Sequence, residues 1–373
     1  MATRRQTIFN RLLGFLAANV IAVGPASAES RSYVISWFAQ ATYTQEGDCE
    51  GGQHPEVELQ YLKNLEPLGY SEEEIAEYRR KLLAGEPSDL MQIMGRRGRI
   101  DGEPVNPYTH PAAVADPMLP SHSGKFAFGF DLDGAGAESE DAYTDPVTGE
   151  AGVDHEMYRA LGCARSFRGT LEGRPTYWAW AWGQTKESQP AWLITVTGPD
   201  AGEDGPATIR IERALEHLVS NSDGSPRAHM TYRVDPDPRS RNEFEAEIEG
   251  GRLHITEHER FRMLQNPLVA PVLELENAHL RMNLDDGADI HGFIGGYQPW
   301  EPIYFGFGQI GIGGELQVTG DIPALYHLLR KHADANPDPE TGLNRSISAT
   351  YYFEAVPAFV INPEDTDSSS TAG

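Results

Sequence analysis

Acidic side chains are concentrated in the segment from Phe128 to Cys163, where their types and spacing suit a hard cation. No Lys or Arg stands between Lys125 and Arg159, so these carboxylates repel one another unless a cation lies among them. Ca2+ takes about six to eight oxygen ligands, and closely spaced Asp residues with Gly between them let a short backbone surround it. We therefore expect structural Ca2+ in this segment, with the candidate ligands Asp131, Asp133, Asp141, Asp145 and Asp154.

The alternative for this segment is a solvated acidic loop on an acidic protein. Its spacing is not that of an EF-hand, because Gly134 follows the second Asp directly and no Glu stands at the twelfth position. Asp145-Pro146-Val147-Thr148-Gly149 recurs as Asp338-Pro339-Glu340-Thr341-Gly342. Each copy predicts a β-turn with Pro at its second position, and this turn explains the recurrence without a repeat architecture.

A second metal pattern, H-x-x-E-H, is formed by His254, Glu257 and His258. Zinc-protease chemistry needs both His on one face of a helix, with the Glu beside a metal-bound water. Here the pattern begins in a predicted strand directly after the turn Gly250-Gly251, so Glu257 would point away from the two His. We expect a calcium-stabilised binding or structural protein of unknown ligand. The alternatives are a metal-dependent hydrolase that uses this H-x-x-E-H zinc site and a carbohydrate-active β-sandwich protein. The sequence contains no G-x-S-x-G, S-x-x-K or phosphate-loop motif.

Aromatic side chains offer two candidate ligand surfaces. Trp178, Trp180 and Trp182 alternate with Ala, which predicts a strand with the three indoles on one face. We expect this face to fill the core, with a sugar-stacking platform as the alternative. Exposed aromatic residues that would contact an extracytoplasmic ligand, carbohydrate or protein, are expected instead at Tyr297, Trp300 and Tyr304.

The N-terminus has the pattern of a secretory signal peptide over residues 1–28. Arg4, Arg5 and Arg11 precede a short apolar run, and Ala26-Ser27-Ala28 is a small-residue cleavage site. Removal of three Arg and no acid changes the net charge from −26 to −29. Such a charge argues against nucleic acid and anionic membranes as partners. We expect a periplasmic or secreted protein without a transmembrane segment in the mature chain; general secretory and twin-arginine export both remain open.

Cys49 and Cys163 are the two cysteines of the chain, and neither lies in a C-x-x-C motif. In an oxidising compartment, an even and minimal count favours one disulfide. The bond would connect the N-terminal region to the end of the acidic segment.

Local signals predict a mainly β protein. Ser71 with Glu74 forms a capping box that starts a helix ending near Gly85, and Asp321 caps a C-terminal helix to about Ala335. Short strands with turns between them, including a hairpin about Gly250-Gly251, favour a jelly-roll-like β-sandwich with a small α-helical N-terminal appendage and one C-terminal helix. The expected organisation after residues 1–28 is an N-terminal strand, helix and irregular connector (29–122), a β-sandwich-like domain with the acidic loop (123–361) and a disordered tail (362–373).

Within the connector, the basic island 96–99 is either a solvated face or an internal partner for acidic groups. The Gly-rich run 292–314 has no single predicted conformation.

Asp131-Leu132-Asp133-Gly134, Gly152-Val153-Asp154 and Ala160-Leu161-Gly162-Cys163 resemble segments of exported proteobacterial proteins. The GGYQPW and HADANPDPETG stretches add to this resemblance, which spans residues 123–361. These proteins carry no assigned activity, so the resemblance implies export and assigns no functional residue.

Overall fold

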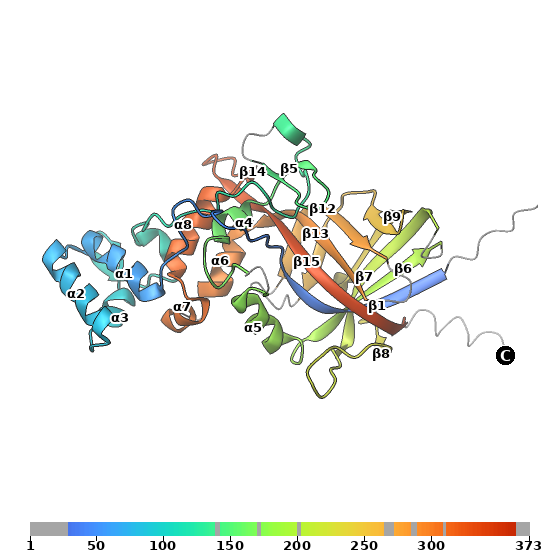
Figure 1. The fold of residues 1–373 in the computed structure, drawn as a ribbon, viewed down its shortest axis with the longest axis horizontal. Coiled ribbons are helices and arrows are strands. Elements are labelled where there is room, and N and C mark those ends of the chain that lie inside the picture. Colours follow the sequence, from blue (N-terminus) through green and yellow to red (C-terminus); the bar gives the residue numbers. More distant parts are fainter. Residues whose placement is uncertain are drawn as a thin grey trace, which may run out of the picture.

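A closed antiparallel β-barrel forms the centre of the molecule in the computed structural model, which describes residues 29–138, 142–169, 173–199, 203–264, 272–284, 289–308 and 311–362 (Figure 1). Around the barrel, the strand order is β1-β6-β7-β9-β10-β12-β13-β15, and β15 pairs again with β1. These strands are β1 (Glu29–Gln40), β6 (Pro190–Gly198), β7 (Gly205–His217), β9 (Arg241–Glu249), β10 (Arg252–Ile255), β12 (Val272–Asn283), β13 (Ile290–Pro299) and β15 (Asn344–Ile361).

The β-sandwich prediction was therefore wrong, and the length of β15 gives the reason. This strand of 18 residues pairs with β13 from Ser346 to Ala355 and with β1 from Tyr351 to Pro357. The last strand thus joins the first, so the sheet has no free edge along this path and does not split into two layers.

The barrel interior is filled by side chains. Alternate residues of all eight strands belong to one buried cluster, for example Ile209 on β7, Ile248 on β9 and Leu280 on β12. Period-two burial of this kind explains the alternating patterns in the sequence. A barrel of eight strands is narrow enough for side chains alone to fill it.

Smaller strands extend this architecture. β8 (Met230–Arg233) runs parallel to β15, whereas β11 (Phe261–Leu264) pairs with β12 and β14 (Ala335–Pro337) pairs with β15. Two short hairpins lie outside the barrel, β2 (Gly98–Ile100) with β3 (Glu103–Val105) and β4 (Tyr143–Thr144) with β5 (Ala151–Val153).

The described residues contain eight α-helices, not the small appendage and single C-terminal helix that we predicted. Figure 1 shows α1 (Val57–Leu65), α2 (Glu72–Ala84) and α3 (Leu90–Met94) farthest from the barrel. Between them and the barrel lie α4 (Glu156–Leu161), α6 (Trp300–Gly308), α7 (Ile312–Val318) and α8 (Ile322–His332), and α5 (Thr176–Thr185) packs against β1. Single 3-10 turns are η1 (Glu66–Leu68), η2 (Pro111–Ala113), η3 (Gly136–Glu138) and η4 (Pro238–Ser240).

The tryptophan-rich segment corrects another prediction, because it is helix α5 and not a strand. Trp178 is fully buried whereas Trp180 is 43% exposed, so the indoles do not share one face. Tyr177, Trp178 and Ala181 form the buried side at helical spacing. The two Ala residues between the indoles are strong helix formers, and this preference outweighs the alternation.

Predictions that rest on local signals are confirmed. Ser71 and Glu74 form the capping box of α2, and the left-handed Gly85 ends it. Asp321 accepts a hydrogen bond from the Ala324 N–H at the start of α8. The hairpin about Gly250-Gly251 joins β9 to β10. The Gly-rich run resolves into β13, α6 and α7 among the described residues.

One residue of the basic island is an internal partner, though not for the acidic loop. The buried Arg97 donates to Glu315 (2.7 Å) and Asp321 (2.6 Å), which belong to α7 and the N-terminus of α8. Tyr61 on α1 also donates to Glu315, and Asn64 donates to Asp321 at 2.7 Å. This network connects the N-terminal helices to α7 and α8.

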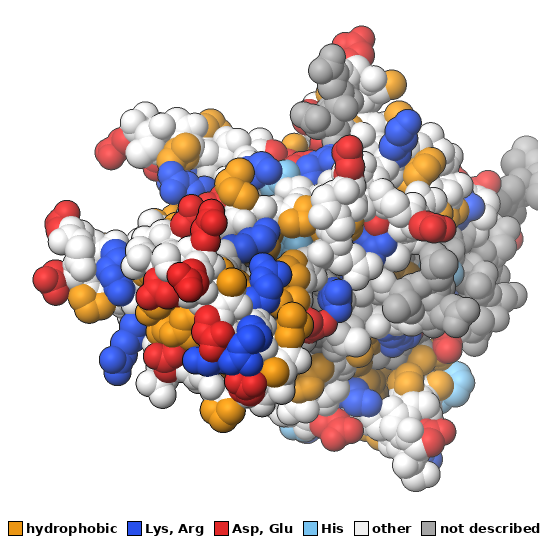
Figure 2. Space-filling view, turned by 60° about the vertical axis from the view of Figure 1, so that its left-hand side comes forward, with side chains coloured by type: hydrophobic (Ala, Val, Ile, Leu, Met, Phe, Trp, Pro, Cys, Tyr) orange, Lys and Arg blue, Asp and Glu red, His pale blue; other side chains and the backbone are white. Residues whose placement is uncertain are grey.

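Figure 2 brings the helical end of the molecule forward and shows acidic and basic side chains intermingled on that face. Among the residues that the structure describes, none of the helices is long and apolar enough to span a membrane. The predicted signal peptide and most of the predicted tail, residues 363–373, lie outside the described residues.

Candidate functional site

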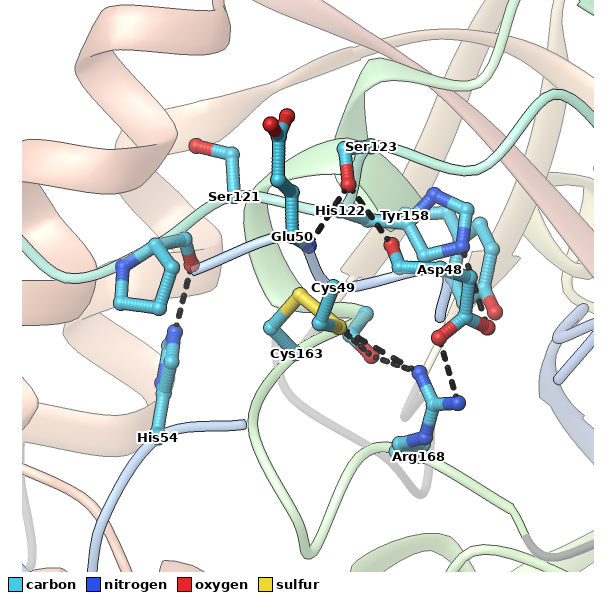
Figure 3. The surroundings of a disulfide bond; sticks show 12 residues. Asp48, Cys49, Glu50, His54, Ser121, His122, Ser123, Tyr158, Cys163 and Arg168 are labelled. Atoms are coloured by element: carbon cyan, nitrogen blue, oxygen red, sulfur yellow. Dashed lines mark hydrogen bonds and ion pairs between the residues drawn. A yellow bond between two sulfur atoms is a disulfide. The ribbon is translucent and has the colours of Figure 1, made fainter. Parts of the chain in front are cut away.

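The predicted disulfide between Cys49 and Cys163 is present and closes a separation of 114 residues (Figure 3). Arg168 lies beside it and forms an ion pair with the buried Asp48 at 2.5 Å. His122 packs over Asp48, and burial lowers the pKa of His122 to about 4. Burial likewise lowers the pKa of His54, which contacts the Pro120 carbonyl, to about 4. Because the two histidines stay neutral and the guanidinium of Arg168 is paired, these groups add no unpaired charge to the junction.

The acidic segment brings three of its predicted ligands together. One carboxylate oxygen from each of Asp131, Asp133 and Asp154 lies within 4.8 Å of the others, and we call these three residues the acidic cluster. Asp154 accepts hydrogen bonds from the N–H groups of Leu132 (2.7 Å) and Asp133 (3.3 Å). These bonds fix the spacing of the cluster across two chain segments.

A close backbone contact supports this arrangement. Gly152, two residues before Asp154, has φ +87°, and a Cβ atom there would lie 2.6 Å from the Gly136 Cα. Only glycine fits at this point. The spacing Gly-x-Asp in the sequence is therefore a requirement of packing the β4–β5 hairpin against the acidic loop.

The electrostatics of the acidic cluster are unbalanced. Burial raises the pKa of Asp154 to about 6, although backbone N–H groups act against this shift. Oδ1 of Asp131 is buried and has no hydrogen-bond partner among the described residues. Among all the residues that the structure describes, no Lys, Arg or His forms an ion pair with the three carboxylates. Such a group has the charge and oxygen donors that a divalent cation requires.

The other two predicted calcium ligands have different positions. Asp141 lies outside the described residues. Asp145 lies apart from the acidic cluster: it is 1% exposed, accepts from the N–H groups of Val147 (2.8 Å) and Thr148 (2.9 Å), and is paired with Arg281. The predicted turn is confirmed, since Asp338 caps the second copy in the same way through Glu340 and Thr341.

The H-x-x-E-H residues do not form a metal site in this structure. His254 is on strand β10, and His254, Glu257 and His258 are all exposed. His258 instead stacks on His279, with ring centroids 3.6 Å apart. Over the described ranges, the acidic cluster is the single group of three metal-ligating side chains within reach of one another. The strand geometry explains the result, because the helical face that the motif needs is absent there.

A cavity of about 590 Å³ lies on the outer face of β1, β12, β13 and β15, and Phe128, Asp145 and residues 147–148 of the acidic segment also line it. We call it the groove. Its walls include a row of rings: Phe128 stacks on Phe293 at 4.8 Å, and Phe293 contacts Tyr352 at 5.4 Å. The rings of these three residues are half-buried. Aromatic walls with a few polar groups are typical of small-molecule sites.

Charged and polar groups line the same groove. Arg174 lies over the Trp37 ring at 4.0 Å and is paired with Glu354. Arg281 lies over Phe293 at 5.1 Å. Gln40 also lines the groove; it is 2% exposed, and neither its amide oxygen nor its amide nitrogen has a hydrogen-bond partner among the described residues. A buried amide without partners is costly unless a ligand or water satisfies it.

The predicted aromatic surface is not where we expected it. Tyr304 is fully buried, Trp300 is 5% exposed and Tyr297 is half-buried. Trp300 lines a second cavity, of about 980 Å³, beside α8 and β14. The nearby acids contribute to a raised pKa of Tyr297, after burial itself, so this ring lies close to the acidic cluster.

Sequence reasoning missed the groove residues. Phe293 and Tyr352 alternate with the buried Ile294 and Tyr351, so their outward direction was readable from the period of two. Their pairing across β13 and β15 was not, because it depends on register.

Comparison with protein-family models, with curated proteins and with solved structures found no match to this chain.

Proposed function

We propose that this is an exported binding protein that holds its ligand in the groove and is stabilised by Ca2+ in the acidic cluster. The observation that carries the proposal is the partnerless buried amide of Gln40 in a cavity lined by three adjoining rings. A ligand that both donates and accepts hydrogen bonds would satisfy this amide.

An oligosaccharide is the ligand class that best fits these walls. A sugar ring presents apolar C–H faces that can lie on Phe128, Phe293 or Tyr352, and hydroxyl groups that can donate and accept. The guanidinium of Arg174 is already paired with Glu354, so the groove does not require an anion for charge balance. This supports a neutral polar ligand.

Calcium would stabilise the wall of the groove. Phe128 in the groove is followed by Asp131 in the acidic cluster, and the groove residue Thr148 leads to Asp154. The two segments meet at isolated bridges, Phe126 with Thr144 and Phe130 with Asp154. A cation shared by Asp131 and Asp154 would tie these segments together at the point where they form the wall.

Export is the remaining part of the proposal. The signal-peptide pattern of residues 1–28 supports it, and so does the disulfide, because such bonds persist in oxidising compartments.

The test is a glycan-array screen of the oxidised full chain, followed by calorimetry with the best oligosaccharide. Phe293→Ala and Gln40→Leu are expected to weaken binding at least about tenfold, or 1.4 kcal/mol. Phe305→Ala is the matched control, since Phe305 is 44% exposed but does not line the groove. Failure of all glycans to bind, or equal binding by wild type and both groove variants, would contradict the proposal.

A further inference from the structure

Three side chains at the junction of α4 and α8 form a hydrogen-bonded chain that the groove does not use. Oγ of Ser121 lies 2.7 Å from Nε2 of His332, and Nδ1 of His332 lies 2.9 Å from Oε2 of Glu156. From these contacts we propose a second site, in which Ser121 is a nucleophile for acyl transfer, His332 its general base and Glu156 the residue that positions His332. This proposal goes beyond ligand binding in the groove.

The connectivity is the one that activated serines require. The base must contact the hydroxyl through one ring nitrogen, while a carboxylate orients it through the other. Both distances lie within the range of about 2.6 to 3.2 Å expected for such contacts. A serine of this type is recognised by geometry, which explains why the sequence shows no nucleophile motif: Ser121 is 211 residues from His332, and His332 is 176 residues from Glu156.

Each member is held by its own element. Glu156 lies in the first turn of α4, and its N–H donates to Ser348 at 2.9 Å while Arg159 donates to its carboxylate at 2.5 Å. His332 is the last residue of α8. The Pro120 carbonyl that precedes Ser121 contacts His54. In Figure 3, the hydroxyl of Ser121 points away from the disulfide.

The site is partly open to solvent. Ser121 is half-buried, and the side chains of His332 and Glu156 are 11% and 19% exposed. None of the three lines the groove. The hydroxyl is therefore partly accessible to a small acyl ester from solvent.

The reaction that follows is ester hydrolysis in two steps. Ser121 Oγ forms a bond to the acyl carbon while its proton moves to Nε2 of His332; the bond to the alcohol then breaks, and the alcohol leaves with that proton. Water then attacks the acyl carbon and gives a proton to Nε2 of His332. The bond between the acyl carbon and Oγ breaks, the acid leaves, and Oγ takes that proton back from His332. Glu156 stabilises the imidazolium in both steps.

The test uses the oxidised full chain and a fluorophosphonate probe, which forms an Oγ–P bond with loss of fluoride. We expect one adduct per chain, mapped by mass spectrometry to Ser121. Ser121→Ala should abolish it, and His332→Gln should slow labelling at least about 100-fold. Glu156→Gln, which keeps the shape of the side chain, should slow labelling at least about tenfold while the fold is retained.

Ser123→Ala is the matched control, because Ser123 lies in the same loop but its hydroxyl hydrogen-bonds to the backbone of Glu50 and Asp48. It should be labelled as fast as wild type. Heat-denatured wild type should not be labelled, and circular dichroism should show that each variant is folded; His332→Asn replaces His332→Gln if the latter unfolds. No adduct on Ser121, or an equal labelling rate without the imidazole, would mean that the three residues only join α4 to α8.

Discussion

Two regions of the molecule gather carboxylates, and they differ in whether the chain supplies the counter-charge. At the helical end, Glu315 and Asp321 are fully buried and share the guanidinium of Arg97. In the acidic cluster, Asp131, Asp133 and Asp154 are closer to solvent, and the described part of the chain provides them with backbone N–H groups but no cation. The difference is that the carboxylates of one region share a cation supplied by the chain, whereas those of the other could hold an external ion.

The largest expected effect is the removal of the internal cation. Arg97→Met leaves Glu315 and Asp321 buried without the cation that they share, so the free energy of unfolding should fall by about 3 to 5 kcal/mol. Urea denaturation of the variant measures this. Arg96→Met is the control, because Arg96 is exposed and should change stability by less than about 0.5 kcal/mol. Equal losses in both variants would remove the distinction between the two regions.

A third region, around the disulfide, sharpens the comparison because its buried histidines stay neutral. Burial lowers the pKa of His54 from 6.5 to about 4, so the unfolded chain binds more protons between these pH values. Wild type should therefore lose up to roughly 3 kcal/mol relative to His54→Leu as the pH falls from 6.5 to 4. Chemical denaturation at several pH values checks this, with the exposed His110→Leu as control. A parallel pH dependence of wild type and His54→Leu would refute it.

Calcium should act on the acidic cluster alone. At a free concentration about 100 times Kd, Ca2+ binding to the folded state adds about 2.7 kcal/mol to stability, which raises the melting temperature by a few degrees. Thermal unfolding in Ca2+ and in chelator measures the difference. It should vanish in Asp131→Asn with Asp154→Asn, and the Arg97 network should contribute nothing to it. An unchanged melting temperature in chelator would count against the ion.

The smallest expected effect is that Asp133→Asn and Glu315→Gln change the free energy of unfolding in opposite directions. Without Ca2+, Asp133→Asn should raise the free energy of unfolding by about 0.5 kcal/mol, because it relieves repulsion while its side-chain oxygen still accepts from the Ala135 N–H. Glu315→Gln should lower it by about 1 to 3 kcal/mol, because Arg97 loses one of its two carboxylate partners. Denaturation in chelator compares the two. Destabilisation by both substitutions would show that the acidic cluster is not strained by its own charge.

Local signals predicted the elements that depend on a few adjacent residues. The capping box at Ser71, the cap at Asp321 and the hairpin at Gly250-Gly251 are each stabilised within one turn. The disulfide was predicted from a count of two cysteines and from the signal-peptide pattern of residues 1–28. In the acidic segment, the spacing of Asp131, Asp133 and Asp154 identified residues that the fold brings together.

Long-range pairing explains what the sequence could not predict. The barrel closes only because β15 pairs with β1, for example Tyr33 with Pro357, and no local pattern encodes that contact. The groove depends on the register of the same strands, and the partners of Arg97 stand more than 200 residues away. In α5, the alternation of Trp and Ala was a weaker determinant than helix propensity.

The claim that an external divalent cation completes the acidic cluster is tested most directly by calorimetric titration of the chelator-treated, oxidised protein with Ca2+. We predict one Ca2+ per chain, lost in the Asp131→Asn, Asp154→Asn double variant and retained in Asp338→Asn, whose carboxylate caps the matching turn elsewhere. Absence of binding at millimolar Ca2+, or equal binding by wild type and the double variant, would contradict it.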